Sequence, residues 1–258
     1  MATSILKQLV SSKLSTNKIL TRQNYLDFNS SSTKTTITSN LTSLVAPLVE
    51  IAPLELGELP LHQSLIKFVE QATAQGFERI KVIPLFLAPG VHVTEDIPVE
   101  IATAINQINN RVTIELSPYL GKYSGIVKLL SARFAQLSTG SRILVAHGSR
   151  LPAVANCTQA LGKQLQAAIA YWSIKPSLSQ QVATLVAAGQ QKIAILPYFL
   201  FSGKITKQIA SEVARLQNEY PTIELVVGEP LGAKEVVAEL AELIVQEIIN
   251  SDAEQIYR

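Results

Sequence analysis

The chain has 258 residues, and its 22 Lys and Arg nearly balance its 20 Asp and Glu, which gives a formal net charge of +2. The length fits one large domain or two of ordinary size, because domains cluster near about 100–150 residues. The balanced charge argues against nucleic acid as a partner, since nucleic-acid binders carry a basic excess. The single cysteine, Cys157, excludes a disulfide framework, and no apolar run reaches the roughly 20 residues of a membrane span. We therefore expect a cytoplasmic protein with no membrane partner, which acts on a small molecule rather than a polymer.

The first 45 residues differ in composition from the rest of the chain. They are rich in Ser, Thr and Asn, contain a single acidic residue, Asp27, and approach low complexity over Asn29–Ser43. One interpretation is an organelle transit peptide, which would place the protein in the plastid stroma, although Arg22 is the only arginine and transit peptides are arginine-rich. The other interpretation is a polar, poorly packed first β-α unit, because such a composition buries little apolar surface.

Beyond residue 45, helical and strand-like patterns alternate. In chain order, the first series is expected to be helix, strand, helix and strand over Leu65–Ala74, Lys81–Leu87, Thr94–Ile108 and Val112–Leu116. The second series is expected to be strand, two helices, strand, helix, strand and helix over Arg142–Val145, Ala153–Tyr171, Leu178–Ala188, Lys192–Phe201, Ile205–Asn218, Thr222–Val227 and Ala233–Ile249. Gly76 and Gly189 are expected to end helices, and Pro98 to lie in a first helical turn. This alternation predicts βαβ units and parallel sheets.

The two series are copies of one another. The segment GFERIKVIPLFLAPG, which starts at Gly76, aligns without a gap on GQQKIAILPYFLFSG, which starts at Gly189. Further matches are TIEL at Thr113 and Thr222, and Leu-Gly at Leu120 and Leu231. The sequence therefore predicts two duplicated, Rossmann-like α/β domains with parallel sheets, over residues 46–138 and 139–258. Because open parallel sheets bind ligands beyond the carboxyl ends of their strands, two such halves would enclose one central cleft.

Two of the three histidines lie at the expected carboxyl ends of strands. His92 follows the strand Lys81–Leu87, and His147 follows Arg142–Val145 in the segment AHGSR. In that segment Gly148 allows a sharp turn and Ser149 can cap the next helix. An imidazole near neutral pH binds a borderline divalent metal or accepts a proton, so both histidines are candidate metal ligands and catalytic groups.

The other titratable candidates are weaker. The third histidine, His62, precedes a helix and is expected at the surface. Glu55 lies in the segment LELGELP, is expected at a strand end and can serve there as a proton acceptor. Glu95 and Asp96 open a helix, where the helix dipole favours acidic residues, so a structural role is the simpler interpretation of both.

Two of these segments resemble a known family. PLFLAPGVHVTEDIP, over Pro84–Pro98, and VAHGSR, over Val145–Arg150, resemble motifs of the sirohydrochlorin chelatases of the CbiX/SirB type, which are relatives of ferrochelatase. The resemblance covers about residues 50–250 and extends to the duplication of the long, two-domain members. It implies two Rossmann-like halves with a tetrapyrrole between them, and insertion of Co²⁺, Fe²⁺ or Ni²⁺ into sirohydrochlorin without an organic cofactor.

The resemblance also implies residue roles. His92 and His147 would take up the metal and help to remove the pyrrole protons, and Glu55 would assist them. Four loop positions are expected to contact the substrate, namely Gly90, Gly148, Ser149 and Gly203. The substrate's propionate and acetate groups suit helix N-termini and scattered Lys or Arg side chains. We expect a monomer with a pseudo-twofold axis or a weak homo-oligomer.

The sequence departs from the family pattern at one histidine in each half. A spacing of 26 residues separates His147 from Ser173, and the same spacing counted back from Glu55 reaches Asn29, which cannot accept a pyrrole proton and is a poor ligand for Co²⁺ or Fe²⁺. In the second half Ile205 aligns with His92. One interpretation is a composite site in which His92 and His147 face one another across the cleft. The alternative is a catalytically degenerate homologue that binds tetrapyrrole or metal without turnover.

Overall fold

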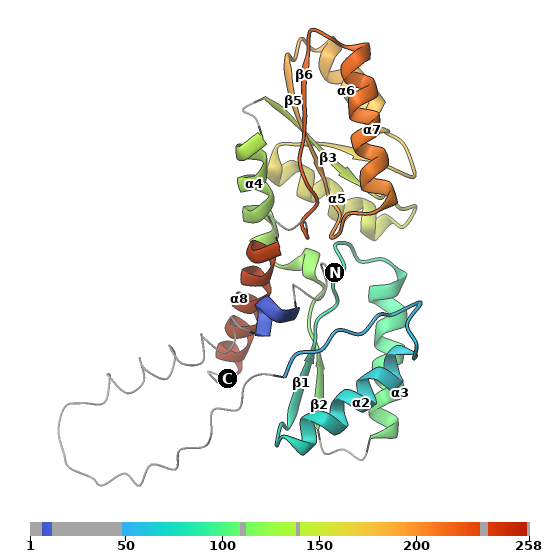
Figure 1. The fold of residues 1–258 in the computed structure, drawn as a ribbon, viewed down its shortest axis with the longest axis vertical. Coiled ribbons are helices and arrows are strands. Elements are labelled where there is room, and N and C mark those ends of the chain that lie inside the picture. Colours follow the sequence, from blue (N-terminus) through green and yellow to red (C-terminus); the bar gives the residue numbers. More distant parts are fainter. Residues whose placement is uncertain (1–6, 12–47, 109–111, 138–139, 233–236, 257–258) are drawn as a thin grey trace, which may run out of the picture.

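The computed structural model describes residues 7–11, 48–108, 112–137, 140–232 and 237–256. Most of the polar segment 1–45, including Asn29, lies outside the described residues. Two parallel α/β units are stacked end to end along the long axis of the molecule (Figure 1). In the part of the chain that the structure describes, no helix is long and apolar enough to cross a lipid bilayer.

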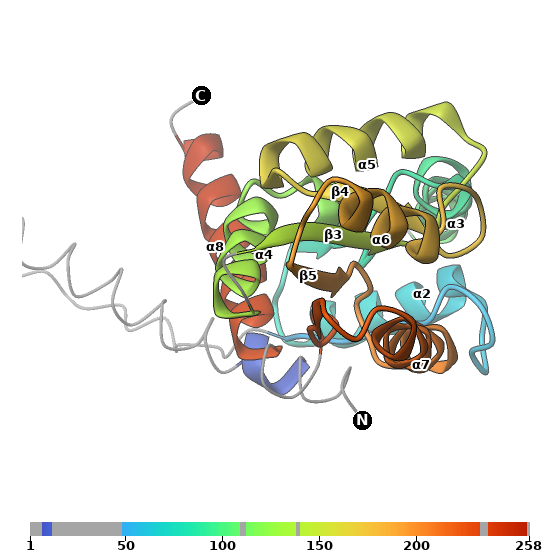
Figure 2. The ribbon, with the colours of Figure 1, turned by 90° about the horizontal axis from the view of Figure 1, so that it is seen from above.

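The second half is a four-stranded parallel sheet covered on both faces. Its strands, in the order β4-β3-β5-β6, are β4 (Ala168–Tyr171), β3 (Ser141–Ala146), β5 (Lys192–Pro197) and β6 (Glu224–Val227). The crossover helices are α5 (Pro152–Leu165), α6 (Leu178–Ala187) and α7 (Lys204–Glu219). Figure 2 shows α5 and α7 on opposite sides of this sheet.

Alternating side chains of the central strands fill the two layers. Ile143 and Ile195 are fully buried on the face that α6 and α7 cover. Leu144 and Leu196, the next residues along the same strands, are fully buried on the face that α5 covers. A strand that is buried on both faces needs apolar residues at consecutive positions. For this reason the sequence has RILV and KIAIL here instead of an alternation of apolar and polar residues.

The first half repeats part of this arrangement. Its elements are α2 (Leu61–Ala74), β1 (Arg79–Val82), the π-helical turn η1 (His92–Asp96), α3 (Ile97–Gln107), β2 (Thr113–Leu116), the 3₁₀ turn η2 (Leu120–Lys122) and α4 (Gly125–Leu137). Strands β1 and β2 are parallel, as are β5 and β6. Gly76 and Gly189 follow α2 and α6 with φ of 78° and 79°, a left-handed conformation that glycine adopts without strain. The structure therefore confirms the predicted duplication and both helix ends.

One detail of the predicted repeat is wrong. In the two sheets Arg79 pairs with Thr113, and its counterpart Lys192 pairs with Glu224. Thr113 is thus equivalent to Glu224, two positions beyond the Thr222 that the TIEL match selects. A shift of two residues keeps each side chain on the same face of a strand. The TIEL match therefore has the same apolar alternation as the true alignment, and β2 and β6 do have the same burial pattern.

The last helix of each half packs against the other half. Helix α4 buries Phe134 against the second sheet, where the Arg142 guanidinium lies 5.5 Å from the ring centroid. Helix α8 (Val237–Ile256) runs down beside the first half (Figure 1), and its residue Leu243 lies close to Gly125. One apolar cluster therefore runs from the second sheet through α4 and α8 to the segments of the first half that follow β1 and β2.

Several predicted elements need correction. The expected helix Ala153–Tyr171 is α5 followed by strand β4, because Gln166 adopts a left-handed conformation (φ 52°) and ends the helix. The expected strands Lys81–Leu87 and Lys192–Phe201 end at Val82 and Pro197. The helix predicted from Thr94 starts as the π-helical turn, with Pro98 in the first turn of α3 as expected. Helix α4 was not predicted.

In the first half, β1 has a strand partner on one edge only among the described residues. Two cavities, of about 240 and 470 Å³, lie along β1. The larger is walled by the apolar faces of α2 and α3, including Leu65 and Ile101. Neither cavity is lined by His92 or His147.

Candidate functional site at the junction of the two halves

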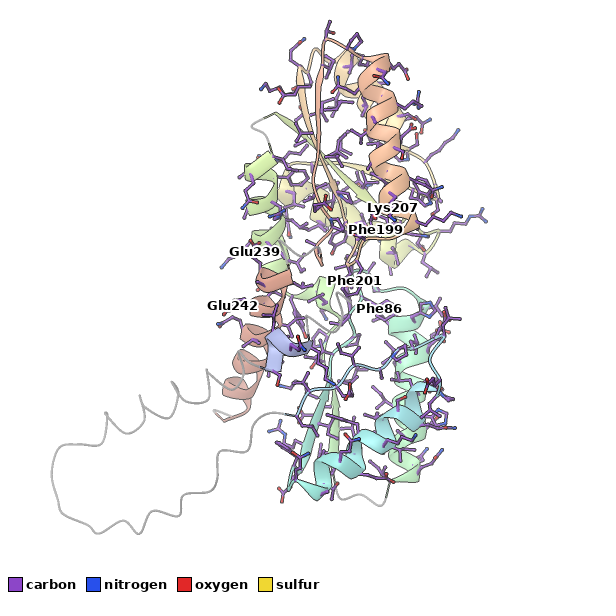
Figure 3. The ribbon with its side chains drawn as sticks, viewed as in Figure 1. Phe86, Phe199, Phe201, Lys207, Glu239 and Glu242 are labelled. Carbon is purple, nitrogen blue, oxygen red and sulfur yellow. The ribbon has the colours of Figure 1, made fainter. Side chains whose placement is uncertain are left out.

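The loops after β1, β3 and β5 leave the carboxyl ends of their strands at the junction between the two sheets (Figure 1). The Tyr198 hydroxyl, just after β5, donates a hydrogen bond across this junction to the Leu87 carbonyl at 3.1 Å. Figure 3 shows Phe86 from the first half and Phe199 and Phe201 from the second near the level where the two halves meet. All three residues are half-buried, and Phe86 and Phe199 also pack against the apolar clusters of their own halves.

His92 is the first residue of the π-helical turn and is 44% exposed. Its Nδ1 lies 2.7 Å from a carboxylate oxygen of Asp96, and its ring centroid lies 5.8 Å from that of Phe86. An ionised carboxylate only accepts hydrogen bonds, so Nδ1 carries the proton and Nε2 keeps its lone pair. A carboxylate paired in this way with a histidine fixes the orientation of the ring and directs the other nitrogen outwards, which suits a metal ligand or a proton acceptor.

His147 follows β3 directly and is exposed. Its Nδ1 donates to the Gly148 carbonyl at 3.0 Å, which again leaves Nε2 with its lone pair. The Ser173 hydroxyl donates to the His147 carbonyl at 2.8 Å, and the Ser173 backbone N–H donates to the same oxygen at 2.9 Å. Gly148 has a φ of 89°, and a Cβ there would lie 2.8 Å from the Ile174 side chain, so the sharp turn predicted at this glycine is confirmed. His147 therefore sits on a tightly held turn.

Glu55 does not lie at a strand end. It is exposed in a bent segment, and no strand precedes it among residues 48–54. The sequence pattern misled because the alternation in LELGELP matches a short strand, whereas Leu56 has a positive φ of 59° and breaks the extended conformation.

His62 is not a free surface residue either. It lies in the first turn of α2, with its ring Nδ1 and its backbone N–H each 2.8 Å from one oxygen of Glu100. These hydrogen bonds, that of the backbone N–H first, hold the pKa of Glu100 below its ordinary value. The contact ties α2 to α3 and gives His62 a structural role.

The predicted loop positions differ in their surroundings. Ser149 does not cap α5, whose N-cap is Leu151; its Oγ instead accepts the Leu151 backbone N–H at 3.1 Å. Gly90 and Gly203 have no atom within 4 Å of the place where a Cβ would project, and both lack a left-handed φ. Open space at these two glycines leaves their backbone accessible in loops that follow β1 and β5.

The sequence did not single out a cluster of hydroxyl and thiol groups at the junction. The Tyr119 hydroxyl lies 3.7 Å from the Cys157 sulfur, and Tyr198 is 6% exposed. Burial, followed by the hydrogen bond with Cys157, raises the pKa of Tyr119 to about 12, and burial raises the pKa of Tyr198 as well. Tyr198 aligns with the apolar Leu85 in the repeat. This difference between the two halves is the sequence signal that could have drawn attention to Tyr198.

Metal-ligating side chains are sparse at the junction. Among the described residues no three His, Cys, Asp or Glu side chains gather in one place. The structure pairs His92 with Asp96, a contact that the sequence analysis did not predict, and His147 is the second imidazole of the predicted site.

Comparisons with known proteins agree with this architecture. The sequence model of the CbiX family matches the chain twice, over residues 29–137 and 141–248. A sirohydrochlorin cobaltochelatase from Methanocaldococcus jannaschii is 46% identical over 52 residues, which is 20% of this chain and 34% of that protein. The chain thus matches about a third of the length of this relative.

Solved structures show the same fold. The structure of SirB from Bacillus subtilis with Fe³⁺ aligns with a TM-score of 0.64 and 24% identity over 81% of this chain and 85% of that one. The sirohydrochlorin chelatase SirB from Bacillus subtilis subspecies spizizenii in complex with cobalt aligns with a TM-score of 0.60 and 24% identity over 79% and 81% of the two chains.

Proposed function

The chain belongs to the CbiX family, and we propose on this basis that it is a sirohydrochlorin chelatase, which inserts Co²⁺ or Fe²⁺ into the macrocycle and can accept Ni²⁺. The observation that supports the proposal is a solvent-accessible imidazole in each half, His92 in the turn that follows β1 and His147 directly after β3, each with its Nδ1 hydrogen-bonded to an oxygen. The names of the relatives support the metals, since one is a cobaltochelatase and the two SirB structures contain Fe³⁺ and cobalt.

Metallation needs two events that these residues can perform. The macrocycle must lose two pyrrole N–H protons, and a partly dehydrated metal ion must reach its four nitrogens. A neutral imidazole near pH 7 does either, because it binds borderline divalent metals and accepts protons. We assign metal delivery and proton removal to His92 and His147 together, with Asp96 orienting the His92 ring. Glu55 remains a candidate proton acceptor through its exposed carboxylate.

The surroundings of the junction suit a flat macrocycle with acidic substituents. The rings of Phe86, Phe199 and Phe201 offer apolar surface for the tetrapyrrole plane (Figure 3). Exposed basic side chains lie in the strand-end loops and the first turns of the second half, namely Arg150, Lys175, Lys204 and Lys207. Lys204 and Lys207 occupy the N-terminal end of α7, where the helix dipole also favours anions. We assign the propionate and acetate groups of the substrate to this basic side of the junction.

The direct test is metallation of sirohydrochlorin followed by absorbance, with Co²⁺, Fe²⁺ and Ni²⁺ in parallel. Wild-type protein is expected to exceed the uncatalysed rate. His92→Ala and His147→Ala should each lower kcat by about 10²–10⁴-fold, the usual effect of removing a general acid or base. His62→Gln is the matched control, because this histidine pairs with Glu100, and it should retain the wild-type rate.

Asp96→Asn separates the orienting role of the carboxylate from the role of the ring. Loss of a partner that orients a metal-binding histidine typically costs 10–100-fold in affinity or activity. We therefore expect Co²⁺ affinity, measured by calorimetry on the folded protein, to fall by about that factor, with a smaller effect of Glu95→Gln. Equal Co²⁺ affinities for wild type and Asp96→Asn would remove the carboxylate from the proposed site.

A binding role without turnover is the second candidate, and a specific observation favours it. The position aligned with His92 in the second half is Ile205, a half-buried residue packed in the apolar layer of that half, so this half offers a single imidazole. If folded wild-type protein binds sirohydrochlorin or Co²⁺ but metallates at the uncatalysed rate, this function replaces the enzymatic one.

A further inference from the structure

Three hydrogen bonds hold the base of the loop that carries His92. The Leu120 backbone N–H donates to the Pro84 carbonyl at 3.0 Å, and the Gly121 backbone N–H donates to the Phe86 carbonyl at 2.9 Å. The Tyr198 hydroxyl donates to the Leu87 carbonyl at 3.1 Å. The first two bonds come from the same half of the molecule, and the third comes from the other half. The start of the loop is therefore held from both sides of the junction.

Tyr198 is also tied to the segment that carries His147. Its backbone N–H donates to the Val145 carbonyl at 2.8 Å, at the end of β3 and two residues before His147. Its ring is 6% exposed and spans from this strand end to Leu87, five residues before His92. Tyr198 therefore joins the two segments that carry the histidines. Its backbone N–H binds the segment of His147, and its side-chain hydroxyl binds the segment of His92.

The repeat makes this link one-sided. The gapless alignment of the halves places Leu85 at the position of Tyr198 and Leu200 at that of Leu87. Leu85 has no hydroxyl, so it cannot donate an equivalent hydrogen bond to the loop after β5. That loop has Ile205 where the other has His92. The buried Tyr198 hydroxyl therefore reaches the loop that carries the histidine, and its counterpart Leu85 cannot do the same for the loop that carries Ile205.

A buried phenol is stable when its hydroxyl has a partner, and here the partner is a backbone carbonyl rather than a mobile side chain. A backbone acceptor fixes the position of the chain itself. Removal of the hydroxyl leaves the ring in place but frees the Leu87 carbonyl. Small displacements of reacting groups matter, because a misplacement of about 1 Å can cost on the order of 10²-fold in rate.

We propose that Tyr198 is a positioning residue that sets the spacing between the loop of His92 and the turn of His147. This inference rests on the proposed chelatase function for its kinetic consequence. Its structural consequence, a defined spacing between the two segments, is independent of turnover.

The kinetic test compares Tyr198→Phe with Tyr171→Phe. Tyr171 is also 6% exposed, and its hydroxyl accepts a hydrogen bond from Gln159 at 3.1 Å, so each variant loses one hydroxyl from an equally buried ring. Tyr198→Phe is expected to lower kcat about 10–100-fold, with the KM for sirohydrochlorin changed less than about twofold. Tyr171→Phe should change neither constant.

The structural test measures the spacing directly. Spin labels at Val91→Cys and Arg150→Cys, both exposed positions, are introduced in a Cys157→Ala background, and the distance distribution is measured by pulsed electron paramagnetic resonance. Tyr198→Phe is expected to shift or broaden the distribution, whereas Tyr171→Phe should reproduce the parent. Urea unfolding of each variant checks that the fold is intact.

The outcomes are distinct. A parent-like distance distribution and kcat in Tyr198→Phe would overturn the proposal, as would equal losses in the two tyrosine variants, which would indicate a general packing effect. If wild-type protein does not metallate sirohydrochlorin but the distribution broadens only in Tyr198→Phe, the chelatase function fails and the positioning role stands.

Discussion

Replacement of Gly121 by alanine should displace the loop that carries His92. Gly121 lies in η2, directly against the Leu87 backbone. A Cβ at this position would lie 2.0 Å from the Leu87 carbonyl oxygen, 2.5 Å from its carbon and 2.8 Å from its Cα. All three are backbone atoms, so no change of side-chain rotamer relieves the overlap. The chain at Leu87 or at Gly121 has to move.

The size of the effect follows from the number of overlaps. Extra atoms forced into a well-packed site typically cost about 1–3 kcal/mol. Three backbone atoms within 3 Å place Gly121→Ala at the upper end, about 3 kcal/mol. For a protein of this size, 1 kcal/mol lowers Tm by roughly 2–4 °C, so a fall of about 6–12 °C is expected. The displacement also strains the hydrogen bonds from Gly121 to Phe86 and from Tyr198 to Leu87, so metallation should fall even where the fold survives.

The assay is thermal and urea unfolding followed by circular dichroism, with Gly90→Ala as the matched control. A Cβ at Gly90 would meet no atom within 4 Å, and its φ lies outside the left-handed region. Gly90→Ala should therefore change stability by less than about 1 kcal/mol. If the free energy of unfolding of Gly121→Ala lies within about 0.5 kcal/mol of the wild-type value, η2 does not approach Leu87 as closely as described. The explanation of how this loop is held would then fail as well.

Further predictions concern the core and the titratable groups. Phe134→Ala removes a fully buried ring and should cost about 3–5 kcal/mol in urea unfolding; a cost under 1 kcal/mol would contradict the packing of α4 on the second sheet. Because the pKa of Tyr119 is raised in the folded protein, the neutral hydroxyl contributes its full stabilisation below pH 10, and this contribution is lost as the pH rises towards 12. The free energy of unfolding of Tyr119→Phe should therefore fall less than that of the wild type between pH 10 and pH 12. The lowered pKa of Glu100 contributes stability above pH 4.5 that is lost as pH falls, so Glu100→Gln should be less stable by under about 1 kcal/mol at pH 7 and should converge with wild type in acid.

The duplication was readable from the sequence because it depends on local rules. Glycines that end α2 and α6 need a left-handed φ, and strands buried on both faces need continuous apolar residues. Strand β4 was missed for an equally local reason. Helix α5 ends at Gln166 instead of a glycine, and the apolar residues of Ala167–Tyr171 continue the helical spacing, so no residue marked the boundary.

The candidate site was less readable, since its contacts join distant segments. Asp96 follows His92 by four residues, a spacing that places two side chains on the same face of a helix, so their pairing could have been predicted. The contact of Tyr198 with Leu87 joins residues 111 apart in the chain. No spacing rule predicts such a pair, because it depends on how the two halves are docked.

The way the halves are docked also explains how the repeat can be unequal without loss of the fold. The register of β1 with β2 is equivalent to that of β5 with β6, and Gly76 and Gly189 adopt the same left-handed conformation, so these features maintain the fold in both halves. The residues that differ, His92 against Ile205 and Tyr198 against Leu85, lie after the carboxyl ends of the strands, outside the paired ladders. Because α4 and α8 each pack across to the other half, the two strand-end regions are held together as one region. The loop that carries His92 in the first half is then held in part by the Tyr198 hydroxyl of the second half, so neither half needs to contain every contact that fixes this loop.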